Sequence, residues 1–176
     1  MKLIYTASQV REAEKPYIEA ADYDGYLMQR AADAVAAEAQ ELLHGKDTAK
    51  ILLLIGPGNN GADTIYAGAR LSAKGHRVDA VIFDPSEKNL ELIAREGGEG
   101  TRVLDPEHTL EHLAGYDLTI DGILGTGSSG AVRGSAGEYL GVLRAAQLDG
   151  KLGAVLAVDT PSGVDNNRGT VHEPSL

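Results

Sequence analysis

The sequence contains no cysteine, and this absence removes several classes of site. Disulfide frameworks, cysteine-ligated zinc, iron–sulfur clusters and thiol nucleophiles all need that side chain. Tryptophan is also absent, phenylalanine occurs once, and 26 acidic side chains outnumber 16 basic ones in 176 residues, for a formal net charge of −10. Because nucleic-acid binding normally relies on a cationic surface and on aromatic stacking, we expect no nucleic acid among the partners.

Long apolar runs are scarce as well. The longest aliphatic run, Ile51 to Ile55, is far shorter than the roughly 20 residues that a helix needs to cross a bilayer. The N-terminus offers only a few apolar side chains before the polar residues Thr6 and Ser8, too few for the core of a signal peptide. We therefore expect a cytoplasmic protein that does not contact a membrane.

Glycine, by contrast, is abundant, with 22 residues where an average protein of this length has about 12. The first 45 residues have the apolar spacing of helices, with Ser8 expected to cap one helix and Gly45 to end another. The apolar stripe from Leu27 to Leu43 is expected in the core or in a dimer interface rather than in a ligand site.

From residue 50 the pattern changes to strands and helices in alternation. Short apolar runs predict strands at 51–55, 78–83, 101–104, 118–124 and 154–158, and amphipathic stretches predict helices at 62–74, 86–96, 106–114 and 135–147. Ser86 is expected to cap the second of these helices. Because parallel neighbours need crossover connections, the alternation predicts an α/β fold with a parallel sheet. We expect a single domain over 1–176, a helical segment over 1–45 followed by a nucleotide-binding core over 50–176.

Three loops follow predicted strands, at the edge where an open parallel sheet binds ligands. The first, residues 56–63 with the sequence GPGNNGAD, matches the dinucleotide pattern G-x-G-x-x-G between a strand and a helix. Such glycines let backbone N–H groups approach phosphate oxygens. Asp84, at the end of the next strand, stands about where a ribose-binding acid is expected. The alternative is a glycine-rich turn that binds nothing.

The second loop, residues 125–130 with the sequence GTGSSG, repeats that glycine spacing after a strand that carries Asp121. The third, residues 159–165 with the sequence DTPSGVD, again places a carboxylate at the end of a strand, although it also suits a plain turn. An acid within an apolar strand is costly to bury without a partner or a cation. Oxygen-bearing side chains without histidine or cysteine favour a hard cation, with room for a monovalent one. These side chains are Asn59, Asn60, Asp63, Asp121, Asp159 and Ser162.

At these residues the chain resembles the YjeF N-terminal family, the NAD(P)H-hydrate epimerases. The resemblance lies in Gly-x-Gly-Asn-Asn-Gly-x-Asp at 56–63, Asp-x-x-x-Gly-Thr-Gly at 121–127 and Val-Asp-x-Pro-Ser-Gly-x-Asp at 158–165, in the family's order. It implies a three-layer α/β/α sandwich with a Rossmann-like, mostly parallel sheet preceded by N-terminal helices. It also implies a homodimer, with the N-terminal stripe in the interface. The implied activity interconverts the R and S forms of hydrated NADH and NADPH, in which water has added to the nicotinamide ring.

The resemblance further implies roles for individual residues. A potassium ion would be the cofactor, held by Asn60, Asp121 and Ser162. Asp159 would act at the reacting ring, as a carboxylate that can give and take a proton if burial raises its pKa. The substrate, NADHX or NADPHX, would contact Asn59, Asn60, Gly61, Ala62, Asp63, Gly125, Thr126, Gly127, Ser128, Ser129, Gly130, Ala131 and Asp159.

The chain departs from the family pattern at three places. Ala62 and Thr64 stand where the family commonly has glycine, so two side chains enter a place where the backbone is expected to come close to the substrate. Ser128 and Ser129 lie in a stretch where some members carry a lysine, so no lysine is assigned a role. The family usually continues past the third motif, which leaves open that the chain is a fragment without the dehydratase domain to which many bacterial members are fused.

Two other functions stay open. A noncatalytic nucleotide-binding or scaffold module would keep this fold without turnover, and an ordinary nicotinamide dehydrogenase would leave the second and third loops without a purpose. Residues 108–112 match the H-x-x-E-H pattern of inverted zinc proteases. Because the predicted helix is short and no third ligand is evident, these residues are interpreted as part of a solvated connecting helix.

Overall fold

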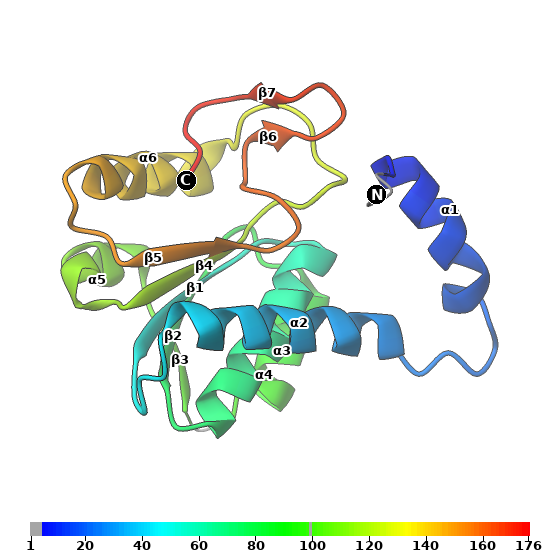
Figure 1. The fold of residues 1–176 in the computed structure, drawn as a ribbon, viewed down its shortest axis with the longest axis horizontal. Helices are drawn as coiled ribbons and strands as arrows, with labels where there is room; N and C mark the ends of the chain where they lie inside the picture. The colour runs from blue at the N-terminus through cyan, green and yellow to red at the C-terminus, as the bar shows by residue number, and fades with distance from the viewer. Residues whose placement is uncertain (1–4, 99) are drawn as a thin grey trace.

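A five-stranded parallel sheet forms the centre of the molecule. In the computed structural model, which describes residues 5–98 and 100–176, the strand order is β3-β2-β1-β4-β5 (Figure 1). In that order the strands span Thr101–Val103, Arg77–Ile82, Lys50–Ile55, Leu118–Gly122 and Ala154–Ala157, and every neighbouring pair is parallel. The predicted α/β fold is confirmed. Residues 1–4 of the predicted helical segment lie outside the described residues.

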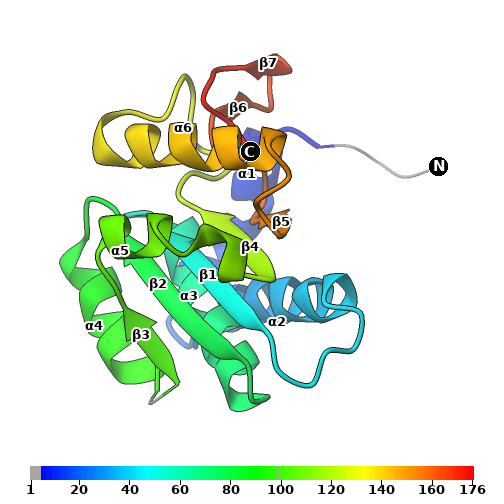
Figure 2. The ribbon, with the colours of Figure 1, turned by 90° about the vertical axis from the view of Figure 1, so that its left-hand side faces the viewer.

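Helices cover both faces of this sheet. One face carries α2 (Tyr26–Leu42), α3 (Asn59–Ala73) and α4 (Glu87–Glu96), and the other carries α5 (Pro106–Leu110), the 3-10 helix η1 (Leu113–Gly115) and α6 (Gly134–Leu148) (Figure 2). Along β1, Ile51, Leu53 and Ile55 pack toward α2 and α3, whereas Leu52 and Leu54 pack toward α6. A strand covered on both faces needs a continuous apolar run, which is what β1 has. The three-layer sandwich is confirmed.

Helix α2 belongs to the core of the chain itself. Ala32, Ala36, Ala39 and Leu43 are buried, and they join the cluster of side chains beneath β1. The alanines allow the backbones of α2 and α3 to approach closely, because their side chains end at Cβ. The core alternative for this stripe is therefore confirmed at these four positions, whereas Leu27, Met28 and Val35 are only half-buried and the dimer interface stays a prediction.

The helix ends agree only partly with the predictions. Ser86 caps α4 as expected, since its side chain accepts a hydrogen bond from Asn89 N. The cap of α1 (Ala7–Ile18) is Thr6 and not Ser8: the Thr6 side chain accepts from Gln9 N while the Gln9 side chain accepts from Thr6 N. This reciprocal pair satisfies two backbone donors, which favours Thr6 over Ser8 as the first residue outside the helix.

Most predicted elements differ from the observed ones by one or two residues at an end, and two predicted helices differ more. Helix α3 begins at Asn59 rather than at residue 62, so Asn59 to Asp63 form its first turn and not a loop. The predicted helix at 106–114 is divided into α5 and η1, because His112 between them has φ −120° and ψ 17°, outside the helical region. A short antiparallel pair, β6 (Val164–Asp165) with β7 (Thr170–Val171), follows β5 and had no counterpart in the predictions.

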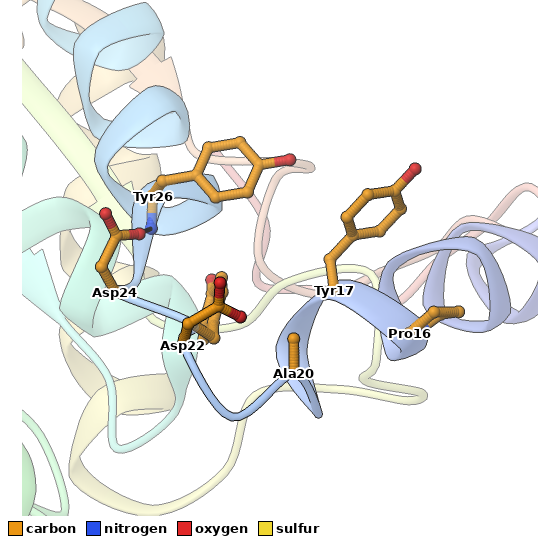
Figure 3. A pocket seen from close by; sticks show the side chains of 7 residues that line it. Pro16, Tyr17, Ala20, Asp22, Asp24 and Tyr26 are labelled. Carbon is orange, nitrogen blue, oxygen red and sulfur yellow. Dashed lines mark hydrogen bonds between the residues drawn. The ribbon is translucent and has the colours of Figure 1, made fainter.

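Helix α1 lies apart from the three layers, beside the loop that follows β4 (Figure 1). It buries no side chain, and Tyr17 and Ile18 at its end are at least half exposed. A surface hollow of about 230 Å³ separates this end from the start of α2, and its lining includes Tyr17, Tyr23 and Tyr26 (Figure 3). None of the predicted site residues lines this hollow. No helix of the described chain has both the length and the apolar character that crossing a membrane requires.

Candidate functional site

The three glycine-containing loops meet where β1, β4 and β5 end. Asn60, in the first turn of α3, donates from Nδ2 to the carbonyl oxygens of Leu124, at 3.0 Å, and Val158, at 3.1 Å. One amide thus bridges the loops that follow β4 and β5. Its other atom, Oδ1, is buried and has no hydrogen-bond partner. A buried acceptor without a donor is unusual in proteins, so this oxygen is available to a ligand.

Asp121 and Ser162 form a buried, hydrogen-bonded pair in the site. Asp121 is fully buried near the end of β4, and its carboxylate accepts hydrogen bonds from Ser162 N at 2.8 Å, Ser162 Oγ at 2.7 Å and Ile123 N at 3.2 Å. Burial raises the pKa of Asp121, whereas these three hydrogen bonds act in the opposite direction. The Ser162 hydroxyl also accepts from Leu124 N at 2.9 Å. The buried carboxylate of Asp121 therefore has the hydrogen-bond partners that offset the cost of its burial.

Asp159, in the loop that follows β5, has a strained backbone conformation. Its φ is +63°, the left-handed region that side-chain-bearing residues seldom adopt. A Cβ placed on Gly125 would lie 2.8 Å from Asn60 Oδ1 and 3.0 Å from Asp159 Oδ2. Glycine at 125 is what lets these two oxygens converge on one point of the second loop. Local strain of this kind is frequent at functional sites.

Besides Asp121, the carboxyl group of the site that has a buried oxygen is Asp63 and not Asp159. The side chain of Asp159 is exposed, whereas Asp63 Oδ1 is buried without a hydrogen-bond partner. The pKa of Asp63 is raised to about 7, first by burial and then by the negative charges of Asp159 and Glu14, with Lys88 acting in the opposite direction. Asp159, for which burial was expected, is therefore exposed, and an elevated carboxyl pKa is found at Asp63 instead.

This shift makes stability depend on pH in a defined direction. The folded state holds the Asp63 proton up to about pH 7, whereas the unfolded chain releases it near its ordinary pKa of 3.8, so stability falls as the pH rises between these values. We expect Asp63→Asn to raise the melting temperature more at pH 8 than at pH 5. Asp149→Asn is the control. Lys151 lowers the pKa of Asp149, so the ionised carboxylate favours the folded state and its removal should lower the melting temperature instead of raising it. An equal effect of Asp63→Asn at both pH values would contradict the assignment.

The second loop is ordered by its own backbone. Ser128 donates from both N, at 3.0 Å, and Oγ, at 2.8 Å, to the carbonyl oxygen of Gly125. Thr126, Gly127 and Ser129 are exposed at its tip. Arg11 of α1 reaches this tip, since its Nη1 would lie 3.2 Å from a Cβ on Gly127. The loop thus offers backbone groups to a ligand, with one basic side chain beside them. Gly130 and Ala131 are half-buried at the far end of the loop.

The two departures from the family's glycines face away from the ligand side. Ala62 is fully buried and belongs to the core cluster beneath β1. Thr64 is also fully buried, donates from Oγ1 to Asn60 O at 2.8 Å, and packs so closely on Gly122 that a Cβ there would lie 1.8 Å from Thr64 Oγ1. Both side chains therefore fill the contact between α3 and the sheet. Asn59, in the same turn, is exposed.

Asn89 is a site residue that the sequence analysis missed. It lies in the first turn of α4, is 1% exposed, and donates from Nδ2 to the carbonyl oxygens of Gly56, at 2.9 Å, and Gly58, at 3.2 Å. These bonds fix the first glycine loop from a helix about 30 residues further along the chain. The only sequence signal near it is the Ser86 cap, which predicts the helix and not the contact.

Asn89→Ala is expected to destabilise the protein by about 1–3 kcal/mol, because the buried Gly56 carbonyl loses its donor. Asn89→Asp keeps the shape but sets a carboxylate against two carbonyl oxygens, so its effect should be at least as large. Denaturant unfolding of the three proteins measures both effects. A decrease in the free energy of unfolding below about 0.5 kcal/mol for both variants would show that the first glycine loop keeps its conformation without Asn89.

A family model described as YjeF-related protein N-terminus matches residues 25–176. The chain belongs to this family. The bifunctional NAD(P)H-hydrate repair enzyme Nnr of Corynebacterium glutamicum is 34% identical to it, over 96% of this chain and 29% of the relative. The NAD(P)H-hydrate epimerase of Microbacterium testaceum is 36% identical over 94% of this chain and 62% of the relative. The NAD(P)H-hydrate epimerase of Clavibacter michiganensis is 32% identical over 98% of this chain and 75% of the relative.

This member of the YjeF-related family spans about a third of the length of the bifunctional repair enzymes that it matches. Among solved structures, the yeast protein ynu0, YNL200c, superposes with a TM-score of 0.79 over 99% of this chain and 77% of that one, at 20% sequence identity. At that identity the likeness concerns the fold. It extends over the α1 region as well as over the sheet, since nearly the whole chain is covered.

Proposed function

We propose that this chain interconverts the R and S forms of hydrated NADH and NADPH. The observation that carries the proposal is the convergence of the Asp159 carboxylate and the unpartnered Asn60 Oδ1 on Gly125, between two glycine loops suited to phosphates. Relatives named NAD(P)H-hydrate epimerase, which match nearly the whole chain, support it. The substrate would lie along Asn59 to Asp63 and Gly125 to Ala131.

The chemistry needs proton transfer at one carbon. That carbon carries both the ring nitrogen and the added hydroxyl, so inversion proceeds when its bond to nitrogen opens and recloses on the other face. The hydroxyl gives its proton to a base, the bonding electron pair returns to nitrogen, and nitrogen takes a proton; reclosure reverses these transfers. Asp159 is the proposed base, because its Oδ2 lies beside Gly125 of the second loop and its exposed side chain can reach a bound substrate.

We further propose a potassium ion at Asn60, Asp121 and Ser162. The donor set is made only of oxygen, and Asn60 Oδ1 has an unused lone pair in a buried position, which suits a hard cation. When bound, the ion would supply a positive charge near the substrate phosphates. The residues themselves hold the three loops together through the Asn60 and Ser162 hydrogen bonds.

Two further features of the family are proposed for this chain, a homodimer and a cytoplasmic location. The dimer contact would use the half-buried part of the α2 stripe, which includes Leu27 and Val35. Size-exclusion chromatography with light scattering distinguishes a dimer from a monomer. A monomer at all accessible concentrations would contradict this part of the proposal.

The decisive experiment is epimerisation of purified R-NADHX in potassium and in sodium buffers, followed by chromatographic separation of the epimers. We expect conversion above the spontaneous rate, faster with potassium. Equal acceleration in potassium and in sodium would support the epimerase activity but overturn the proposed potassium site. Binding of NADHX without any acceleration would favour a noncatalytic module. Equal binding of NADH and NADHX would favour a dehydrogenase.

A further inference from the structure

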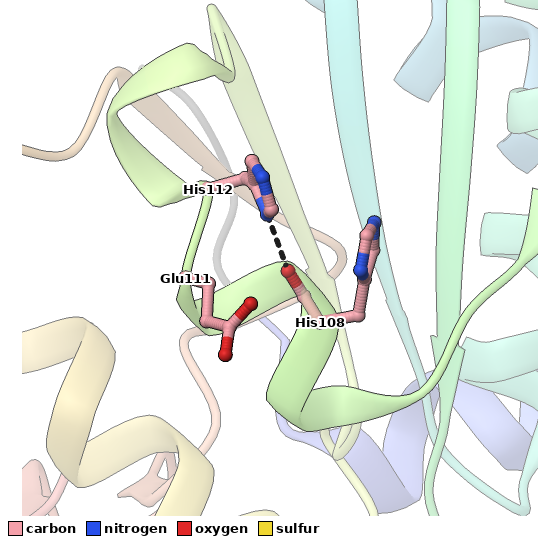
Figure 4. A group of neighbouring side chains, drawn as sticks. All are labelled: His108, Glu111 and His112. Atoms are coloured by element: carbon pink, nitrogen blue, oxygen red, sulfur yellow. Dashed lines mark hydrogen bonds between the residues drawn. The ribbon is translucent and has the colours of Figure 1, made fainter.

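A cluster of three metal-ligating side chains lies outside this site, on α5 and the turn that follows it. His108, Glu111 and His112 are exposed, and one ligand atom of each lies within 4.8 Å of those of the other two (Figure 4). Among the described residues, no other group of three histidine, aspartate or glutamate side chains comes together in this way. The cluster follows β3, at the opposite edge of the sheet from β5.

The spacing explains why these side chains meet. Residues three and four positions apart lie on one face of a helix, so His108 faces both Glu111 and His112. The two imidazole rings are 4.8 Å apart between their centroids. Among the described residues, no basic side chain forms an ion pair with Glu111.

The hydrogen bond of His112 prepares it as a ligand. Its Nδ1 lies 2.9 Å from the backbone oxygen of His108, and a carbonyl oxygen can only accept, so Nδ1 carries the proton (Figure 4). In the neutral ring Nε2 then holds a free lone pair. Metal-bound histidines typically donate their other N–H to a carbonyl or carboxylate in this way, which fixes the tautomer and the ring orientation.

We propose that His108, Glu111 and His112 form a binding site for a divalent transition-metal ion. Zinc suits the set best, because two imidazoles and one carboxylate are a common zinc ligand set. Ligand atoms around a tetrahedral zinc ion lie about 3.4 Å apart, and the present ligand atoms lie up to 4.8 Å apart. The exposed side chains of His108 and Glu111 can rotate toward Nε2 of His112 while its Nδ1 keeps the hydrogen bond to His108 O. The net charge of −10 also favours the approach of a cation.

Three protein ligands leave the fourth position of zinc open. A hollow of about 360 Å³, lined by Val103, Leu104, Asp105 and His108, adjoins the cluster through His108. Water or a small anion can therefore reach the ion. This site differs from the zinc-protease pattern considered from the sequence, because Glu111 serves as the third ligand and not as a catalytic base. His108, Glu111 and His112 are solvent-exposed, as expected from the sequence, and the proposal adds a metal-binding role to them.

Calorimetric titration of the full chain with zinc chloride tests the proposal. We expect one zinc ion per chain, bound at least about 10-fold more weakly by His108→Ala, by His112→Ala and by Glu111→Gln. The control is His172→Ala, which removes a histidine outside the cluster and should leave the affinity unchanged. The same titration gives the expected result whether or not the chain is an epimerase.

Two results would overturn the proposal. Zinc binding that persists unchanged in both histidine variants would place the ion elsewhere, and unchanged binding by Glu111→Gln would reduce the site to a histidine pair. Nitrogen-15 NMR of the histidine rings supplies a second measurement. Zinc should shift Nε2 of His112 while its Nδ1 stays protonated, and a loss of the Nδ1 proton would contradict the geometry in Figure 4.

Discussion

Asp159→Asn is expected to lower the epimerisation rate by about 10²–10⁴-fold while leaving the fold intact. Asparagine keeps the size of the side chain but is not basic enough to take the proton of the substrate hydroxyl. It also tolerates the left-handed backbone, where Asp159 has φ +63°, better than most residues do. The side chain is exposed, so no core packing is lost. Affinity for the hydrated cofactor should change much less than turnover.

The rate is measured on R-NADHX in potassium buffer, and the fold by thermal unfolding. Asp149→Asn is the matched control, because it removes an exposed negative charge before β5 rather than after it. This control should keep the full rate. An Asp159→Asn protein that epimerises at the wild-type rate would exclude Asp159 as the base and direct attention to Asp63, another carboxyl group of the site.

Gly56→Ala is expected to produce the largest loss of stability, about 3 kcal/mol or more. A Cβ at this position would lie 1.9 Å from Ile123 O, a backbone atom of the segment after β4. No rotation of a side chain relieves such a contact, so β1 and β4 must separate where Gly56 N donates to Gly122 O at 3.2 Å. The same shift would displace Asn60 and Asp121, so activity should fall together with stability.

Gly58→Ala tests whether the effect belongs to position 56 alone. Gly58 lies in the same loop, has φ −92°, and a Cβ there meets nothing within 4 Å. Its replacement should change the free energy of unfolding by no more than about 1 kcal/mol. Denaturant unfolding of both variants provides the comparison. Similar losses at the two positions would show that the loop is sensitive to any side chain and that the close approach of Ile123 is not the cause.

The strands and most helices were predictable because each depends on local pattern. The run Ile51 to Ile55 is continuous and apolar because both of its faces are covered, and Ser86 follows proline and precedes an amphipathic stretch. The three loops were predictable for a related reason, since parallel strands bring their carboxyl ends to one edge. Asn60, Asp121 and Ser162 do meet there.

Contacts between distant segments were not predictable in this way. Asp79, for example, lies within the apolar run of β2, and only the fold shows that Arg102 and Tyr116 satisfy its buried carboxylate. The same holds for Asn89, which binds the first glycine loop from another helix. No local spacing signals these pairs, because their partners lie more than 20 residues away.

The sequence by itself therefore determined the α/β alternation, the edge at which the site lies and the residue types that form it. The tertiary structure alone decided the environment of each carboxyl group: Asp121 is fully buried, Asp63 has one buried oxygen and an elevated pKa, and Asp159, for which burial was expected, is exposed. It also decided that Ala62 and Thr64 face the core and that Ala32, Ala36, Ala39 and Leu43 of α2 are buried. Burial and the charges around a group depend on every neighbouring segment, and residue spacing along one segment does not contain that information.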